Sequence, residues 1–488
     1  MKKIVVCLVI LLIWAPRAAA QGALAQNPEV ASAIRLWEAW MESQMAYRQQ
    51  PGISVGIVYD QEIIWSRGFG FADVEKKTPA TPQTNYRIAS ISKLFTSTAI
   101  LQLRDAGKLQ LDDPVVKYLP WFKPRNKFAD VPVVTIRHLL THTSGLPRES
   151  DFPYWTDAKF PTREQMMARL AEQETIYPPE TRWKYSNLAL ALAGEIVAAV
   201  SGEPYHVYIE KRILGPLGMT ATSVLVPPEH RARLATAYGR RMPDGKRELR
   251  PFMDTSGIAP AANLSSNVED LARFAALQFR DGPAEASGAG PTGGKQILRG
   301  ATLREMHRIH WLEPDWQSGW GLGFSVRRLA GRTLVGHGGA LAGYRTQVSL
   351  DPKEKIGVIV LTNSDDGDPG MYADKFFELV APAIAKAAER PSAPKQADAA
   401  WNAYVGLYRS PWGDSQVLIL NGELVIINPT AMDVRSSILK LIPVGPHTFR
   451  MEGESGGAAV GELAVFEIGA DGKVARLKTG SNYTFPVR

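Results

Sequence analysis

The chain has 488 residues, of which 45% are apolar and 22% charged. This ordinary globular mixture excludes a disordered, collagen-like or multi-span membrane protein, and the length suggests two to three domains. The formal net charge is +7, and it becomes smaller if the first residues are a removable leader. This excess of positive charge is too small to predict a nucleic-acid partner.

The amino terminus has the pattern of a secretory signal peptide. Lys2 and Lys3 precede an apolar run over residues 4–14, and small residues follow up to Ala25. We predict a signal peptide over residues 1–25, cleaved after Ala20 or Ala25, and therefore an exported protein, periplasmic or secreted. A short membrane anchor is the alternative, although the run is shorter than the roughly 20 residues that span a bilayer.

The only cysteine, Cys7, lies inside this apolar run. If the segment is removed, the mature chain has no cysteine. Disulfide scaffolds, thiolate metal sites and cysteine nucleophiles are then excluded together.

Residues 26–389 are predicted to form one large α/β unit whose sheet unites both ends of the segment. Helical periodicity predicts helices over about 29–47, 90–106, 187–200 and 372–389, and a capping-box pattern at Ser266 predicts another that continues to about residue 279. Strand-like runs cover residues 53–59, 62–70, 323–329, 343–350 and 356–361. Residues 282–294, rich in Gly, Ala and Pro, are predicted to be a surface loop.

Residues 390–400 are predicted to be a linker, and residues 401–488 a small all-β domain. Short strand candidates cover residues 404–408, 417–420, 424–428, 438–441, 463–468 and 474–478. The dipeptides Asn421-Gly422 and Asp471-Gly472 are typical of hairpin turns. This pattern favours a small barrel.

Ser90 and Lys93 are three residues apart at the start of a predicted helix, so their side chains share one face. A base must activate a serine hydroxyl, and burial can lower the pKa of a lysine enough to serve. Two other Ser-x-x-Lys matches lie in the linker and in a β pattern, where the geometry is unsuitable. The alternative for Ser90 is a helix cap beside a surface lysine.

Tyr185-Ser186-Asn187 opens a second predicted helix. A phenol near a lysine can lose its proton more readily and relay it, and an amide can hydrogen-bond a lysine and a substrate carbonyl. A third segment, His337-Gly338-Gly339-Ala340, lies between strand-like runs, where glycines allow a substrate backbone to approach. The alternatives are a buried tyrosine with a capping asparagine, and a tight turn with a surface histidine.

In this order the three segments resemble the serine β-lactamase and penicillin-binding-protein family, in particular its class C β-lactamase and D-Ala-D-Ala carboxypeptidase branch. Residues 136–146, 262–271 and 319–323 add to the resemblance, which covers about residues 30–385. It implies an α/β (α+β) β-lactamase/transpeptidase-like domain with an antiparallel sheet and a helical subdomain. The small β-barrel that follows this domain in the sequence, lipocalin-like in some members, is a known appendage of the family.

The resemblance further implies an acyl-enzyme mechanism without metal or cofactor. Ser90 would be the nucleophile, Lys93 and Tyr185 would share the proton transfers, and Asn187 would position the acyl group. The N–H groups of Ser90 and Ala340 would form the oxyanion hole. Which of Lys93 and Tyr185 is the base stays open.

His337 departs from the Lys-Thr-Gly motif of class C β-lactamases. We expect His337 to attract a substrate carboxylate less than lysine does. This attraction should become stronger as the pH falls from about 8.5 to 5.5 and the imidazole gains a proton. His138 and His142 have a metal-ligand spacing, and His307 and His310 lie close together. Neither pair is predicted to bind zinc.

The sequence therefore predicts an exported serine hydrolase that cleaves amide or ester bonds. A peptidase or amidase on short peptides, some with D-residues, is favoured over an esterase or a β-lactamase of the same fold. A non-catalytic cell-wall-binding protein is the alternative from another class. The partner is a small-molecule or short-peptide substrate, and the oligomeric state is left open.

Overall fold

The computed structural model describes residues 23–282, 294–389, 397–420, 422–431, 437–453, 457 and 459–487. The chain divides into two compact units, Met1–Ala388 and Glu389–Arg488. The predicted signal segment up to residue 22, most of the Gly-rich loop (283–293), residues 390–396 of the linker and Asn421 lie outside the described residues.

The larger unit is built on a nine-stranded sheet in which every pairing between neighbours is antiparallel. β1 pairs with β11, so the sheet unites both ends of the segment, as the sequence predicts. In their order across the sheet the strands are β3 (Thr78–Pro79), β2 (Glu62–Asp73), β1 (Gly52–Tyr59), β11 (Ile356–Thr362), β10 (Tyr344–Asp351), β9 (Arg332–Leu341), β8 (Ser325–Leu329), β7 (Ser318–Trp320) and β6 (Trp311–Leu312).

Strand β9 corrects the prediction for the third motif. His337-Gly338-Gly339-Ala340, which the sequence placed between strand-like runs, is itself part of the second half of a ten-residue strand, and this excludes the alternative of a tight turn. Three glycines at positions 336, 338 and 339 give this segment a poor intrinsic β propensity. Pairing with β10 along residues 335–341 holds it extended.

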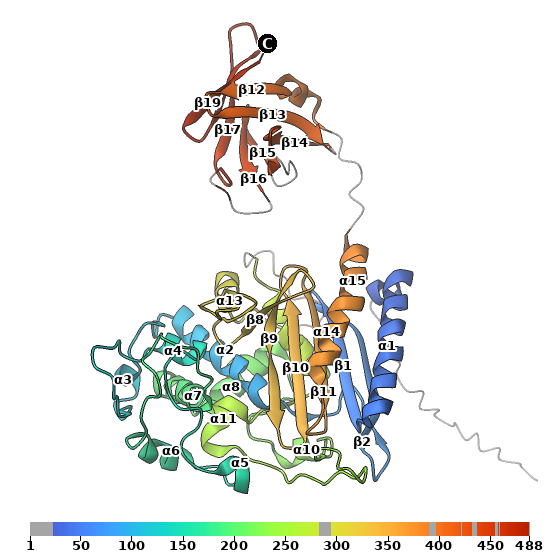
Figure 1. Cartoon of the computed structure of the whole chain (residues 1–488), viewed down its shortest axis with the longest axis vertical. Coiled ribbons are helices and arrows are strands. Elements are labelled where there is room, and N and C mark those ends of the chain that lie inside the picture. The colour runs from blue at the N-terminus through green and yellow to red at the C-terminus, as the bar shows by residue number, and fades with distance from the viewer. Residues whose placement is uncertain are drawn as a thin grey trace, which may run out of the picture. The chain divides into compact units, whose positions relative to one another are not determined.

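Helices cover both faces of the sheet (Figure 1). On one face α1 (Pro28–Arg48) packs with α14 (Pro369–Leu379) and α15 (Ala381–Ala388), and Trp37 is central to their apolar core. The predicted single helix over 372–389 is thus two helices. Pro382 lacks the N–H that would continue the ladder, which accounts for the break at Val380.

On the other face lie α2 (Ser92–Asp105), α7 (Asn187–Ser201) and α12 (Val268–Gln278), each largely buried. The cap of α12 is Asn267, whose side chain accepts from Asp270 N, and not Ser266, which lies in a short strand. The remaining helices are short: α3 (Val115–Tyr118), α4 (Ile136–Thr141), α5 (Tyr154–Asp157), α6 (Arg163–Leu170), α8 (Tyr205–Ile209), α9 (Gly215–Leu217), α10 (Pro228–Arg231), α11 (Ala259–Ala262) and α13 (Gly300–His307).

A second, two-stranded sheet joins β4 (Tyr86–Arg87) to β5 (Ser265–Ser266). It places the segment before Ser90 beside the segment that follows α11. Across the described residues, no single helix is long and apolar enough to cross a membrane; one pair, Asn187–Ser201 with Tyr205–Leu217, meets that test jointly but is bent by 78°.

The smaller unit is a closed barrel, which confirms the predicted all-β domain. Its core is apolar and includes Tyr408, Phe449 and Phe466. The sequence missed two of its strands, β16 and β19. In chain order the strands are β12 (Gly406–Ser410), β13 (Gly413–Leu420), β14 (Glu423–Ile427), β15 (Leu439–Gly445), β16 (Thr448–Glu452), β17 (Leu463–Ile468), β18 (Val474–Thr479) and β19 (Asn482–Pro486).

Candidate active site

Ser90 lies in a short 3₁₀ turn, Ala89–Ile91, that leads directly into α2. The helix proper begins at Ser92, two residues later than the sequence predicts. Ala89 has a φ of 47°, a strained conformation for a residue with a Cβ, immediately before the candidate nucleophile. The turn leaves Ser90 partly exposed, and Lys93 Nζ lies 3.0 Å from Ser90 Oγ.

Lys93 is fully buried, and its amine has three polar neighbours. Nζ donates to Asn187 Oδ1 at 2.8 Å and to the Ala261 carbonyl at 3.0 Å, and Ser90 Oγ is the third. Burial lowers the pKa of Lys93 well below its usual value, Glu149 opposes this shift and Arg148 adds to it. A neutral amine has two N–H donors and one lone pair. The two donors are taken by Asn187 and the Ala261 carbonyl, so the lone pair is left to accept from the Ser90 hydroxyl.

Tyr185 approaches the same hydroxyl from the other side. Its phenol donates to Ser90 Oγ at 2.9 Å, and its ring lies 4.8 Å from Lys93 Nζ. Burial raises the pKa of Tyr185, partly offset by the bond to Ser90. Burial thus opposes loss of the phenol proton, whereas it favours the neutral amine of Lys93.

Asn187 begins α7, behind the Ser186 cap whose Oγ accepts from Ala189 N. Its amide is held at both ends: Oδ1 accepts from Lys93, and Nδ2 donates to Glu149 Oε1 at 2.8 Å. Glu149 thus fixes which end of the amide faces the lysine.

Glu149 is the residue that the sequence reasoning missed. It also accepts hydrogen bonds from Arg148 Nε and Trp155 Nε1, each at 2.9 Å, and from the Tyr154 hydroxyl. It lies between α4 and α5, outside any regular element, so no periodic pattern marks it. Its contact with the site exists only after folding.

The third motif forms the edge of the sheet beside Ser90. β8 pairs with β9 only along Arg332–Gly336, and none of the described strands pairs with residues 337–341 on that side. Ser325 Oγ donates to the Gly336 carbonyl at 2.8 Å, so this carbonyl points toward β8. Strand alternation turns the peptide groups of Gly338 and Ala340 the same way. Ala340 N–H is thus placed to join the Ser90 N–H at an oxyanion.

Gly339 has a steric role in the motif. A Cβ at this position would lie 2.2 Å from both the Ile88 carbonyl and Thr346 Oγ1. A glycine is required because the strand runs against the segment that carries Ser90. Gly338 is exposed, and a Cβ there would meet mainly the end of the Gln347 side chain, at 3.0 Å.

His337 is 5% exposed and packs between the rings of Tyr185 and Trp320. Burial lowers the pKa of His337 to about 3, and the Lys93 charge acts in the same direction. Its Nδ1 lies 2.5 Å from the Gly338 carbonyl, so the proton is assigned to Nδ1 and Nε2 is left as an acceptor. The expectation that His337 gains charge between pH 8.5 and 5.5 is therefore wrong.

One cleft of about 1080 Å³ holds these groups. Ser90, Tyr185, Asn187 and residues 337–342 line it, together with aromatic and charged side chains. Every site residue that the sequence singles out except the buried Lys93 reaches this cleft, and Lys93 contacts Ser90 from behind.

The described residues contain no group of three His, Cys, Asp or Glu side chains that could hold a metal ion. His138 Nε2 lies 2.9 Å from Glu180, and His142 Nδ1 accepts from Ser186 N. His307 Nε2 lies 3.2 Å from Gln278 Oε1, and His310 Nε2 contacts the Glu305 carbonyl. Each of the four histidines thus has a partner within the protein.

Comparison with known proteins gives the family. The family model described as beta-lactamase matches residues 37–382. Beta-lactamase-like protein 2 of Dictyostelium discoideum is 30% identical over 350 residues, 69% of this chain and 61% of that protein. The match thus spans less than two thirds of that relative.

Similar solved structures include the following two. The octameric penicillin-binding protein homologue from Pyrococcus abyssi has a TM-score of 0.62 and 27% identity, over 92% of this chain and 99% of its own. A D-stereospecific amidohydrolase from Streptomyces sp. has a TM-score of 0.57 and 25% identity, over 71% and 97%. From the family match, with Lys93 and Tyr185 both contacting Ser90 Oγ, the chain belongs to the beta-lactamase family, whose members are generally serine hydrolases.

Proposed function

We propose that the protein hydrolyses amide or ester bonds through an acyl-enzyme on Ser90. The observation that carries this proposal is the position of Ser90 Oγ, 3.0 Å from a buried lysine amine and 2.9 Å from a phenol donor. A buried lysine of lowered pKa with one free lone pair is a general base for a serine hydroxyl.

The reaction follows from these positions. Lys93 takes the proton of Ser90, and Oγ forms a bond to the substrate carbonyl carbon while the carbonyl electron pair moves to oxygen. The N–H groups of Ser90 and Ala340 stabilise this oxyanion. Its collapse expels the leaving nitrogen or oxygen, which receives the Lys93 proton by way of the Tyr185 hydroxyl. A water molecule, deprotonated by the same pair, then hydrolyses the Ser90 ester and restores the hydroxyl.

We favour a peptidase or amidase on short peptides. The free edge of β9 offers backbone N–H and C=O groups to an extended peptide, a common form of peptide recognition. The similar D-stereospecific amidohydrolase supports the same class and the possibility of D-residues. The neutral His337 stands where class C β-lactamases have a lysine cation, and for this reason we favour a β-lactamase less.

A non-catalytic binding protein is the rival from another class. It would have no need for a buried lysine amine beside a serine, because burying an amine without function costs stability. We further propose, from the charged, apolar and small-residue order of residues 1–25, that the protein is exported.

A turnover screen of the mature protein tests the proposal. The panel holds p-nitrophenyl esters, a chromogenic cephalosporin, and D- and L-aminoacyl p-nitroanilides and short peptides, each measured with wild type and Ser90→Ala. Amide turnover that Ser90→Ala abolishes supports a peptidase, whereas turnover of esters alone supports an esterase. Turnover that survives in Ser90→Ala, or none with any substrate, contradicts the proposal.

A further inference from the structure

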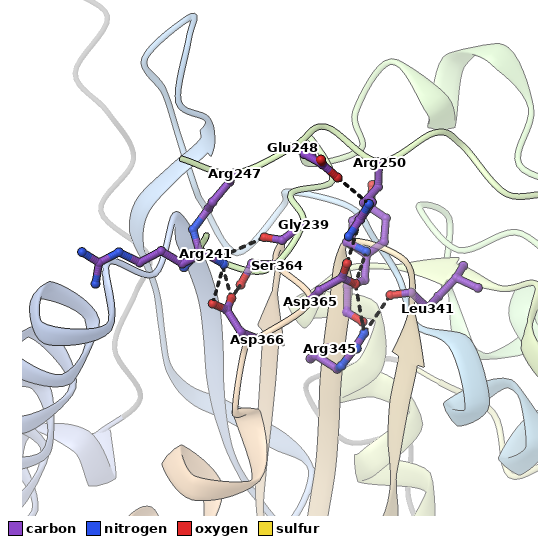
Figure 2. Close-up of polar contacts among 12 residues, drawn as sticks. Gly239, Arg241, Arg247, Glu248, Arg250, Leu341, Arg345, Ser364, Asp365 and Asp366 are labelled. Atoms are coloured by element: carbon purple, nitrogen blue, oxygen red, sulfur yellow. Dashed lines mark hydrogen bonds and ion pairs between the residues drawn. The ribbon is translucent and has the colours of Figure 1, made fainter. Parts of the chain in front are cut away.

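The cleft continues past the catalytic groups into a charged end. Beyond Ala340 its lining includes Arg240, Arg250, Arg345 and Asp365. They come from three segments: the stretch after Tyr238, the start of β10, and the loop that follows β11. Figure 2 shows Arg250 and Arg345 meeting at Asp365, beside Leu341 at the end of β9.

Asp365 orients two guanidinium groups at once. Its Oδ2 accepts from Arg250 Nε at 2.8 Å, and its Oδ1 accepts from Gly343 N at 2.7 Å and lies 3.5 Å from Arg345 Nη1. Arg345 Nη1 also donates to the carbonyls of Leu341 and Tyr344, each at 2.9 Å. Both carboxylate oxygens are therefore occupied, and a substrate cation would have to displace a guanidinium.

The arginines keep donors for a ligand. No acceptor among the described residues takes a hydrogen bond from Arg345 Nη2 or Nε, or from Arg250 Nη2. The Arg250 guanidinium lies against the backbone of Gly239, where a Cβ would meet it at 3.1 Å. Each of these two side chains is 31% exposed and lines the cleft.

The charge at this end is positive. Arg240 is exposed and has no ion-pair partner within the described residues. Asp366, also on the lining, is neutralised by Arg247, whose Nη1 lies 2.5 Å from Asp366 Oδ1. Arg240, Arg250 and Arg345 then face two carboxylates, Asp365 and the exposed Glu248, whose Oε2 lies 3.1 Å from Arg250 Nη1. An excess of one positive charge remains.

We propose that this end of the cleft binds a carboxylate of the substrate. Leu341 lies one residue beyond Ala340, whose N–H is placed at the oxyanion. The bound group would therefore lie roughly one to two residues of an extended peptide, about 3 to 7 Å, along the strand from the reacting carbonyl. Guanidinium groups held in a fixed orientation favour a planar carboxylate, from an acidic side chain or a chain terminus. The preferred substrates are then acidic peptides, an inference that rests on the proposed function.

The test uses ester and peptide pairs that differ only in charge. One pair of p-nitrophenyl esters carries Glu or Gln two residues before the scissile carbonyl. One pair of fluorogenic peptides carries them two residues after it. We expect wild type to prefer the Glu member of one pair in kcat/KM, and Arg240→Gln and Arg345→Gln each to reduce that preference roughly five- to tenfold. The preference should also fall in 0.5 M NaCl.

Arg241→Gln is the matched control. Arg241 is exposed like its neighbour, does not line the cleft, and donates to Asp366 Oδ2 through its backbone N–H. Figure 2 shows its side chain extending away from Arg250 and Arg345. Arg241→Gln should leave the Glu-to-Gln ratio unchanged, and thermal melting of all variants checks that the fold is intact.

The two proposals fail in different ways. If the Gln substrates are turned over but neither pair shows a Glu preference that Arg240→Gln or Arg345→Gln reduces, the carboxylate subsite is refuted while the hydrolase stands. If no substrate is turned over, binding of the same peptides to Ser90→Ala is followed through the tryptophan fluorescence of the cleft. An equal affinity for Glu and Gln peptides then refutes the subsite as well.

Discussion

Glu149 is expected to set the pH at which the candidate base becomes active. Its carboxylate lies beyond the Asn187 amide, one 2.8 Å hydrogen bond from Nδ2, and the amide Oδ1 lies 2.8 Å from Lys93 Nζ. The amine and the carboxylate are then about 7 Å apart, where an opposite charge at an effective permittivity of about 20 contributes about 2 kcal/mol, or roughly 1.5 pKa units. The Glu149→Gln variant keeps an acceptor for Asn187 and removes this charge.

The sign of the effect is fixed. A negative charge near an amine raises its pKa, so Glu149→Gln should lower the pKa of Lys93 further, and the loss of a partner for Arg148 acts in the same direction. The amine is then unprotonated at lower pH. We expect the acidic limb of the kcat/KM profile to move down by about one to two pH units. The plateau should fall modestly, because a base of lower pKa is weaker.

The assay is hydrolysis of a p-nitrophenyl ester from about pH 4 to 9, with initial rates corrected for the pH-dependent absorbance of the product. Glu164→Gln is the control, because this carboxylate is 75% exposed and faces Arg163 on the surface. Its profile should match wild type. An acidic limb in Glu149→Gln that stays in place or moves to higher pH would refute the role of Lys93 as the titrating base.

Three further predictions follow from the site. Lys93→Ala and Tyr185→Phe should each lower kcat strongly. Because the two groups act as one proton-transfer unit, the double variant should be no slower than the slower of the two single variants. A loss of kcat in the double variant equal to the product of the two single losses would show that the groups act independently. Gly339→Ala should lower the free energy of unfolding by about 2 kcal/mol or more in urea titrations, because its Cβ would overlap one backbone oxygen and one side-chain oxygen. The control Gly338→Ala should unfold like wild type. Since the pKa of His337 is about 3, the ratio of kcat/KM for matched anionic and neutral substrates should carry no inflection from this residue between pH 5.5 and 8.5, and an inflection lost in His337→Gln would contradict its burial.

Much of the fold could be predicted because periodicity reports burial directly. The apolar positions at Val30, Ile34, Trp37 and Met41 mark the buried face of α1. The turn between Tyr59 and Glu62 marks the first hairpin. Ser90, Lys93, Tyr185 and Asn187 could be found because their spacing is local to the starts of two helices.

The rest depends on contacts between distant segments. Strand β9 is rich in glycine, and its extended form comes from its partner β10 rather than from its own residues. Glu149 reaches Asn187 across 38 residues of sequence, from an irregular segment. The protonation of His337 and Tyr185 follows from burial, which their spacing in the sequence does not reveal.

The most direct test of the central claim is covalent labelling of Ser90. The mature protein is incubated with a fluorophosphonate, and the intact mass and the modified peptide are determined by mass spectrometry. We predict a single adduct on the peptide that contains Ser90, absent in Ser90→Ala and slowed in Lys93→Ala. An adduct on another residue, equal labelling of Ser90→Ala, or ester turnover without any adduct would contradict the assignment of Ser90 as the nucleophile.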